Sequence, residues 1–448
     1  MKINFYFTAL LLVLFQKGMS QSKATDIQTF TLSNGMKILV LEDNSIPNAN
    51  MYLFWKVGSR NEYPGITGLS HFFEHMMFNG SKKYGPKMFD RTMEAAGGSN
   101  NAYTTENLTV YSDWFPISAL ETIFDLEADR IGHLDLDPKM VESERGVVLS
   151  ERSTGLENSN FRNISEQVKG AAFLAHPYRW SVIGYESDIK NWSIEDLQTY
   201  FDTYYAPNNA VVVISGDVTL KEVKRLSKQY FEPIPSGPKA RPIHTIEPEQ
   251  LGQKRVVVEK QVSSPNIMLA YHVPETKHED YYALDVLSAI LSDGNSSRLY
   301  SQLVDQKTLA TSVFSYMPES IDPNLFYFYG VASPGTAPEI LEAEMVQIIS
   351  DIAQNGVSER ELQKVKNQKL VALYSSLETI DGKSNTLGTY EMYFGDYKKM
   401  FSAPQSYEQL TVADIQRVAQ KYFTKNNSTV GYLMSPENNK NSTYEITH

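Results

Sequence analysis

The 448-residue chain contains no cysteine. Disulfides, thiolate metal sites and a cysteine nucleophile are therefore excluded, and so is the lipid-attachment cysteine of a bacterial lipoprotein. Long apolar runs are also scarce, because no stretch after the N-terminal segment is long enough for a transmembrane helix. Basic residues number 41 against 53 acidic ones, which gives a net charge of −12. An acidic chain without a basic patch argues against nucleic acid or an anionic membrane as a partner.

An apolar run opens the chain. Lys2 precedes an apolar core at residues 3–15, and Gly18, Met19 and Ser20 follow it. This order is typical of a secretory signal peptide and predicts a cut after Ser20. An uncleaved membrane anchor is the alternative, although the core is too short to span a bilayer comfortably. We expect a periplasmic or secreted protein with no stable membrane insertion once the signal is removed.

The rest of the chain divides into two parts of similar length. A chain of 448 residues can hold two or three domains. The turn-rich segment 231–253 is dense in proline and glycine, which is typical of a linker. We predict a signal peptide at 1–20, an N-terminal domain at 21–235, a linker at 236–253 and a C-terminal domain at 254–448.

The two parts also resemble each other near their ends. The segment DLQTYFDTYYAPNNAVVVISGDV begins at Asp196, and DIQRVAQKYFTKNNSTVGYLMSP begins at Asp414. In both, a helical pattern leads through an Asn-Asn turn into a β-branched strand, which indicates duplication. Hairpin signals such as Asn34-Gly35 mix with long helical patterns, so we predict α+β domains.

Residues 68–80, GLSHFFEHMMFNG, place ionisable groups inside an apolar run. The apolar residues recur at the spacing of an amphipathic helix, and Ser70 or Thr67 is a candidate cap for its start. His71, Glu74 and His75 fall on the opposite side of this helix.

His71 and His75 are one helical turn apart, so both imidazoles can point at one atom. This is the H-x-x-E-H arrangement of the inverted zincins. Zinc in a catalytic site needs a third protein ligand and one open position, and Glu74 is left free to act as a base. The alternative is a polar helix face that binds no metal.

The third ligand is expected to be acidic and well separated in sequence. The segment ESERGVVLSERS offers Glu144 and Glu151, which are seven residues apart and so share one face of a helix.

Together these residues resemble the pitrilysin and mitochondrial processing peptidase family of zinc peptidases. The resemblance also covers GGSNNAYT, HPYRWSVIGYESDI and YYAPNNAVVVISGD. It implies that His71, His75 and Glu151 bind one Zn²⁺ per chain, that Glu74 is the catalytic base and that Glu144 supports catalysis. The implied fold is two homologous α+β domains, each a mostly antiparallel sheet packed with helices, which form half of a clamshell.

The resemblance further implies a peptide substrate that adds as a strand beside the metal. The matching residues are Asn101, Ala102 and Tyr103, for which plain strand packing is the alternative.

One family feature is missing. Active relatives often carry an arginine and a tyrosine after an SSRL segment, whereas this chain has Val304 and Thr311 at those positions. We therefore expect a zinc metalloendopeptidase that works as the zinc-bearing subunit of a heterodimer, with a second family member supplying the arginine and tyrosine. A homodimer is the alternative assembly. A catalytically silent scaffold or peptide-binding subunit is the alternative function.

Overall fold

The computed structural model describes residues 26–436. The predicted signal peptide at 1–20 lies outside the described residues. Two sheets organise the chain. In spatial order the first contains β1 (Ile27–Thr31), β2 (Lys37–Glu42), β6 (Ala210–Gly216), β3 (Asn48–Trp55), β5 (Thr109–Pro116) and β4 (Ser99–Thr104). The second contains β7 (Lys254–Glu259), β11 (Ser428–Met434), β8 (Asn266–Val273), β10 (Asn324–Ala332) and β9 (Ala310–Tyr316).

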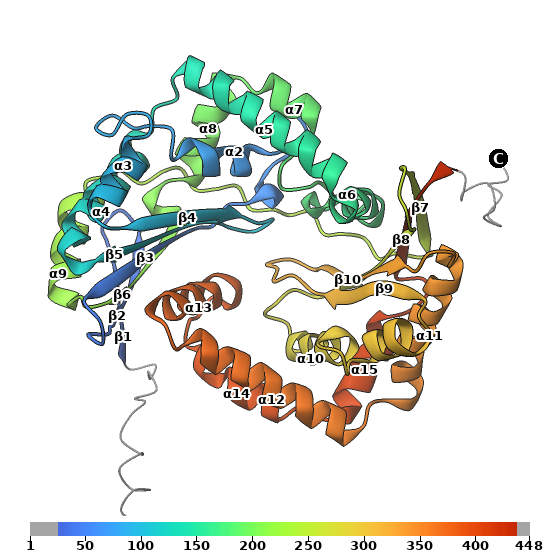
Figure 1. Ribbon diagram of the computed structural model, residues 1–448. Helices are drawn as coiled ribbons and strands as arrows, with labels where there is room; N and C mark the ends of the chain where they lie inside the picture. Colours follow the sequence, from blue (N-terminus) through green and yellow to red (C-terminus); the bar gives the residue numbers. More distant parts are fainter. Residues whose placement is uncertain (1–25, 437–448) are drawn as a thin grey trace, which may run out of the picture.

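Helices surround both sheets (Figure 1). Those of the first half are α2 (Leu69–Met76), α3 (Met88–Ala95), α4 (Leu120–His133), α5 (Pro138–Asn158), α6 (Asn160–Ala172), α7 (Glu186–Asn191), α8 (Ile194–Tyr204) and α9 (Leu220–Leu226). Those of the second half are α10 (Tyr281–Ser292), α11 (Pro338–Asn355), α12 (Glu359–Ser376), α13 (Ile380–Phe394), α14 (Lys399–Glu408) and α15 (Val412–Tyr422). The predicted α+β class is confirmed.

The two sheets share one topology. In each, a single parallel pair, β2 with β6 or β7 with β11, is followed by three antiparallel pairings. The first sheet adds β1, which forms a hairpin with β2 around Asn34-Gly35, and Gly35 has the positive φ of 91° that this turn requires. The predicted duplication is therefore a repeat of whole sheets.

The repeated Asn-Asn turn has the same role in both halves. Asn209 donates from its side chain to Tyr204 O and Lys56 O, at 2.8 and 3.3 Å. Asn427 donates to Tyr422 O and His272 O, at 2.7 and 2.9 Å. Each asparagine thus ties the end of a helix to the neighbouring strand, which explains why the turn occurs twice in the sequence.

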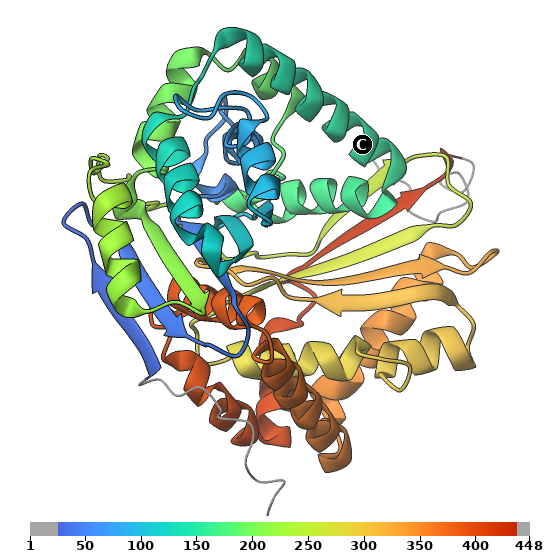
Figure 2. The same ribbon diagram turned by 60° about the vertical axis from the view of Figure 1, so that its left-hand side comes forward.

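Each sheet is covered on one face by helices of its own half and on the other by a helix from the opposite half. Helix α13 lies against β3 and β6, whereas α6 lies against β7, β8 and β11 (Figures 1 and 2). The side chains at these two contacts form separate apolar clusters, one around Phe54 and Leu387 and one around Val168 and Tyr327. The halves are therefore packed together through a reciprocal exchange of helices.

Both exchanged contacts depend on a glycine that allows close approach. A Cβ atom on Gly388 of α13 would lie 1.9 Å from the ring of Phe54. A Cβ atom on Gly431 of β11 would lie 2.4 Å from Val168 of α6. Neither position has room for a larger residue, because the partner side chains, Phe54 and Val168, are themselves fully buried.

Residues 232–253 contain no helix or strand, in keeping with a connecting segment. The division into domains at 235 and 254 stays a prediction, because the exchanged helices cross it. Within residues 26–436, no helix has both the length and the apolar character needed to cross a bilayer.

We expect Gly388→Ala to lower the free energy of unfolding. Alanine favours a helix over glycine by about 1 kcal/mol, but forcing a methyl group into the packed ring of Phe54 costs about 1–3 kcal/mol or more. Gly252→Ala is the control, since no atom lies within 4 Å of its added Cβ. Thermal and denaturant unfolding measure both variants, and a stabilised Gly388→Ala protein would contradict the packing described.

Candidate metal centre

A buried carboxylate begins the helix that carries the H-x-x-E-H motif. Gly68 precedes α2 with a positive φ of 92°. Glu62 accepts hydrogen bonds from the backbone N–H groups of Gly68 and Ser70, at 2.7 and 2.8 Å. Such an acceptor satisfies free amides and suits the positive end of the helix dipole. The expectation that Thr67 or Ser70 caps the helix is wrong, because their hydroxyls bond Asp188 and Tyr200 instead.

The rotation of α2 about its axis is fixed by its apolar side. Leu69, Phe72, Phe73 and Met76 are all fully buried. The ring of Phe73 lies 5.2 Å from that of Tyr205, centroid to centroid. This packing leaves the opposite side of α2 facing α5.

Two arginines hold α5 in place, each directly after one of the predicted glutamates. Arg145 donates to the backbone oxygens of Ile189 and Trp192. Arg152 forms a bidentate ion pair with Glu166 of α6, in which Nη2 donates to Oε1 at 2.8 Å and Nη1 donates to Oε2 at 2.9 Å. With these arginines anchored on one side, Glu144 and Glu151 face α2. Sequence reasoning missed both arginines, although their seven-residue spacing repeats that of the glutamates.

The structure brings the three predicted ligands together. Nε2 of His71 and Nε2 of His75 each lie 3.6 Å from Oε2 of Glu151. Two ligands bound at about 2.1 Å to a tetrahedral centre are separated by about 3.4 Å, so this spacing suits zinc. Among residues 26–436, these three form the single group of histidine, cysteine and acidic side chains compact enough to hold a metal ion.

Glu144 orients His75 through the ring nitrogen that faces away from the candidate metal position. Nδ1 of His75 donates to Oε1 of Glu144 at 2.7 Å, which directs Nε2 toward Glu151. Asn79 donates to the other oxygen of Glu144 at 2.7 Å. A carboxylate in this place fixes the tautomer of a metal-binding histidine and raises its basicity. Sequence reasoning missed Asn79, which lies in the turn that follows the end of α2 at Met76.

The electrostatics of the cluster favour a cation. Burial opposes a charge on His75, but the carboxylates of Glu144 and Glu151 outweigh burial and raise its pKa to about 9. Burial and the neighbouring His75 lower the pKa of His71 to about 4, which keeps that imidazole neutral and able to act as a ligand. The site therefore favours positive charge between two imidazoles and a carboxylate, which is compatible with metal binding.

Glu74 stands apart from the three ligands. Its Oε2 accepts a hydrogen bond from the Thr104 hydroxyl of β4 at 2.6 Å. Burial raises the pKa of Glu74, and the bond from Thr104 reduces this rise without cancelling it. A carboxylate with a raised pKa is suited to take up and release a proton near neutral pH. The contact between Thr104 and Glu74 is a feature of the site that the sequence did not reveal.

The predicted substrate-binding residues lie on an edge strand. Within residues 26–436, β4 pairs with β5 alone, so no described strand pairs with its other edge. Asn101 and Tyr103 are exposed, whereas Ala102 is half-buried on the side that faces the helices. A pocket of about 380 Å³ joins Asn101 and Ala102 to Glu74, His75 and Glu144. The edge and the catalytic side chains thus border one space.

The positions of the missing arginine and tyrosine lie in the second half. Val304 packs partly buried against the second core within the helical turn Tyr300–Gln306. Thr311 is exposed on β9 and donates to Val331 O at 3.3 Å. Arg298, the nearby arginine, is bound to Glu361 and Asp351. In the described part of the chain, none of these three lines the pockets that contain His71, Glu74 or His75.

Two protein-family models match the chain. Residues 37–184 match the model "Insulinase (Peptidase family M16)", and residues 191–369 match "Peptidase M16 inactive domain". The metal cluster lies in the first of these regions.

Relatives of similar length are named zinc proteases. "Zinc protease PqqE" of Helicobacter pylori is 33% identical over 432 residues, which are 95% of this chain and 97% of the relative. "Uncharacterized zinc protease YmxG" of Bacillus subtilis is 24% identical and covers 92% of this chain and 99% of its own length.

Solved structures show the same fold. A protease from Helicobacter pylori superposes with a TM-score of 0.88 at 32% identity, covering 91% of this chain and 99% of that one. The periplasmic protease PqqL from Escherichia coli has a TM-score of 0.78 at 18% identity, and the match covers 96% of this chain but 50% of PqqL. On the evidence of the matching models, the full-length relatives and the shared fold, the chain belongs to peptidase family M16.

Proposed function

We propose that this chain is a zinc-dependent endopeptidase that cleaves peptides or unfolded polypeptide segments. The observation that carries the proposal is the convergence of His71, His75 and Glu151 at 3.6 Å spacing, with Glu74 beside them and outside the ligand set. A metal-binding scaffold has no need of a half-buried carboxylate held by Thr104 next to its ligands.

The chain's own residues divide the work of hydrolysis. His71, His75 and Glu151 would hold Zn²⁺, which when bound acidifies water and polarises a carbonyl group. Glu74 takes a proton from the attacking water on its carboxylate and passes it to the leaving amine nitrogen. Glu144 holds Nδ1–H of His75 throughout, which keeps Nε2 available as a ligand.

The open edge of β4 would align the substrate. A peptide that adds as a strand is bound through its backbone, which gives modest sequence preference. Asn101, Ala102 and Tyr103 lie along this edge, and the pocket beside Asn101 and Ala102 leads to Glu74. Unfolded segments fit this mode, because their backbone N–H and C=O groups are free to pair with the strand edge.

We further propose that the protein acts in the periplasm or outside the cell, as the zinc-bearing subunit of a two-chain assembly. The sequence of residues 1–20 supports export. Two observations support a partner: the chain matches half of the periplasmic protease PqqL, and Val304 and Thr311 replace the arginine and tyrosine of active relatives. The partner would be a second family member that carries this pair.

We expect the purified chain to bind one zinc ion, with affinity that depends on Glu151 and Glu144. Glu151→Gln removes a charged ligand and abolishes tight binding. Glu144→Gln leaves the ligands in place but weakens the affinity roughly 10–100-fold, because His75 loses its orienting carboxylate.

Competition against a chromogenic chelator measures both effects. The control is Glu142→Gln, which changes an exposed carboxylate on the same helix whose side chain is 75% exposed. Unchanged zinc affinity in Glu151→Gln would contradict the ligand set.

We expect Glu74→Gln to bind zinc normally and to lose at least about 100-fold in kcat for a quenched fluorescent peptide library, because the proton acceptor is gone. Glu142→Gln again serves as the matched control. The zinc-loaded wild-type chain is tested alone and with a family partner that carries the arginine and tyrosine. If neither preparation cleaves any peptide, the peptidase proposal is wrong and the alternative function, a catalytically silent scaffold, is supported.

We expect the isolated chain to be weakly active and to gain activity on mixing with such a partner. Light scattering coupled to gel filtration gives the assembly state, and the same peptide library gives the rates before and after mixing. A monodisperse homodimer with strong peptidase activity would contradict the two-chain proposal.

A further inference from the structure

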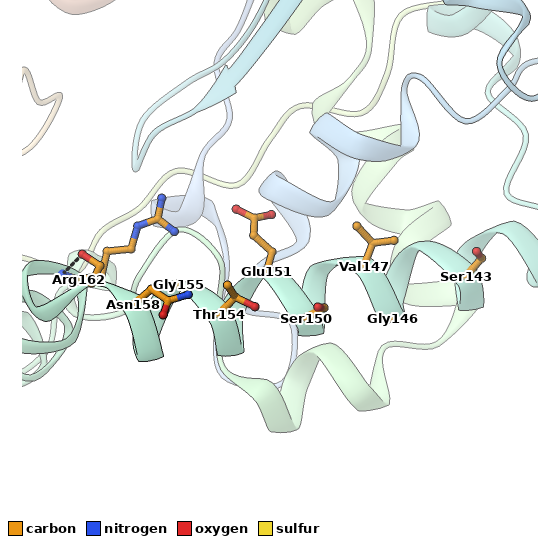
Figure 3. A pocket seen from close by; sticks show the side chains of 10 residues that line it. Ser143, Gly146, Val147, Ser150, Glu151, Thr154, Gly155, Asn158 and Arg162 are labelled. Atoms are coloured by element: carbon orange, nitrogen blue, oxygen red, sulfur yellow. Dashed lines mark hydrogen bonds between the residues drawn. The ribbon is translucent and has the colours of Figure 1, made fainter. Parts of the chain in front are cut away.

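An arginine from α6 lies beside the candidate metal centre, and no side chain among residues 26–436 pairs with its guanidinium. Arg162 is exposed, and its guanidinium crosses over α5 at Gly155, where a Cβ atom would lie 2.7 Å from Nη1 of Arg162. The side chain of Arg162, on α6, and that of Glu151, on α5, point to the same side (Figure 3). Gly155 therefore makes room for a cation next to a metal ligand.

The same arginine lines a pocket with His71 and Glu151. This pocket has a volume of about 410 Å³. Its apolar wall is formed by Leu156, Phe161, Val182 and Ile183.

The other two basic side chains that line this pocket have acidic partners, whereas Arg162 has none among the described residues. Arg152 is paired with Glu166 at 2.8 Å, and Lys169 is paired with Glu106 at 2.6 Å. Within residues 26–436, no side chain or backbone oxygen accepts a hydrogen bond from the Arg162 guanidinium, and no acidic group pairs with it within 4 Å. Once Glu151 is engaged by a metal ion, the pocket contains one unpaired cation beside the reaction site.

We propose that Arg162 forms a carboxylate-binding subsite for the peptide substrate. The guanidinium offers a fork of N–H donors that matches a carboxylate. The carboxylate comes from an Asp or Glu side chain close to the scissile bond or from the substrate's C-terminus. This inference rests on the proposed peptidase function and adds a preference that strand addition along β4 does not supply.

Binding measurements in the Glu74→Gln background test the subsite without cleavage. The probes are fluorescent peptides in which Glu is moved one position at a time, each matched to a peptide with Gln at that position, and each made with a free and an amidated C-terminus. A difference between the Glu and Gln peptides shows that the subsite binds a side-chain carboxylate. A difference between the free and amidated forms shows that it binds the C-terminal carboxylate.

We expect at least one Glu peptide, or the free-acid form, to bind roughly tenfold more tightly than its neutral match, since a hydrogen bond to a charged group has about this effect. Arg162→Ala removes the difference and Arg162→Lys restores part of it, because lysine lacks the fork. Arg360→Ala, which changes an exposed arginine on α12, retains the full difference.

Several outcomes would overturn the subsite. The first is equal or undetectable binding of both peptides of every matched pair by the Glu74→Gln protein. The second is a preference for the charged peptide that survives Arg162→Ala. The third is an equal loss of affinity for charged and neutral peptides in Arg162→Ala, which indicates a packing role. The peptidase proposal is judged separately, because a carboxylate preference in the Glu74→Gln protein does not depend on whether the wild-type chain cleaves. Zinc content is measured in each variant, so loss of metal is distinguished from loss of the subsite.

Discussion

The metal centre depends on how α2 is rotated against α5. The buried apolar side of α2 and the backbone bonds from Gly68 and Ser70 to Glu62 fix the first helix. Arg145 and Arg152 fix the second. A turn of either helix by one residue, about 100°, would separate the histidines from Glu151. The convergence of the candidate ligands is thus a consequence of packing on the far sides of both helices.

The exchanged helices extend this constraint to the whole chain. α6 carries Glu166, which holds Arg152 of α5, and the same helix packs on the second sheet. The position of Glu151 is therefore linked to the C-terminal half through one helix. This link gives the second half a structural role at the metal centre, although the described part of that half holds no metal cluster of its own.

Local periodicity was enough to predict much of this structure. The spacing of His71, His75 and Glu151 followed from helical geometry together with a family resemblance, and the Asn-Asn repeat predicted the duplicated sheets. The roles of Glu62, Asn79 and Thr104 were not predicted, because they arise from contacts between elements that no short motif encodes. Thr67 and Ser70 were assigned as caps from residue type alone, but a buried carboxylate already satisfies those amides. The exchange of α6 and α13 was equally hidden, since a glycine such as Gly388 reveals its purpose only beside Phe54.

Anomalous diffraction at the zinc absorption edge, on crystals of the zinc-loaded chain, tests the central claim most directly. The account predicts one strong peak per chain, about 2.0–2.2 Å from Nε2 of His71, Nε2 of His75 and a carboxylate oxygen of Glu151, with Glu74 outside the coordination sphere. A peak elsewhere, or a zinc ion coordinated by Glu74 in place of Glu151, would contradict it.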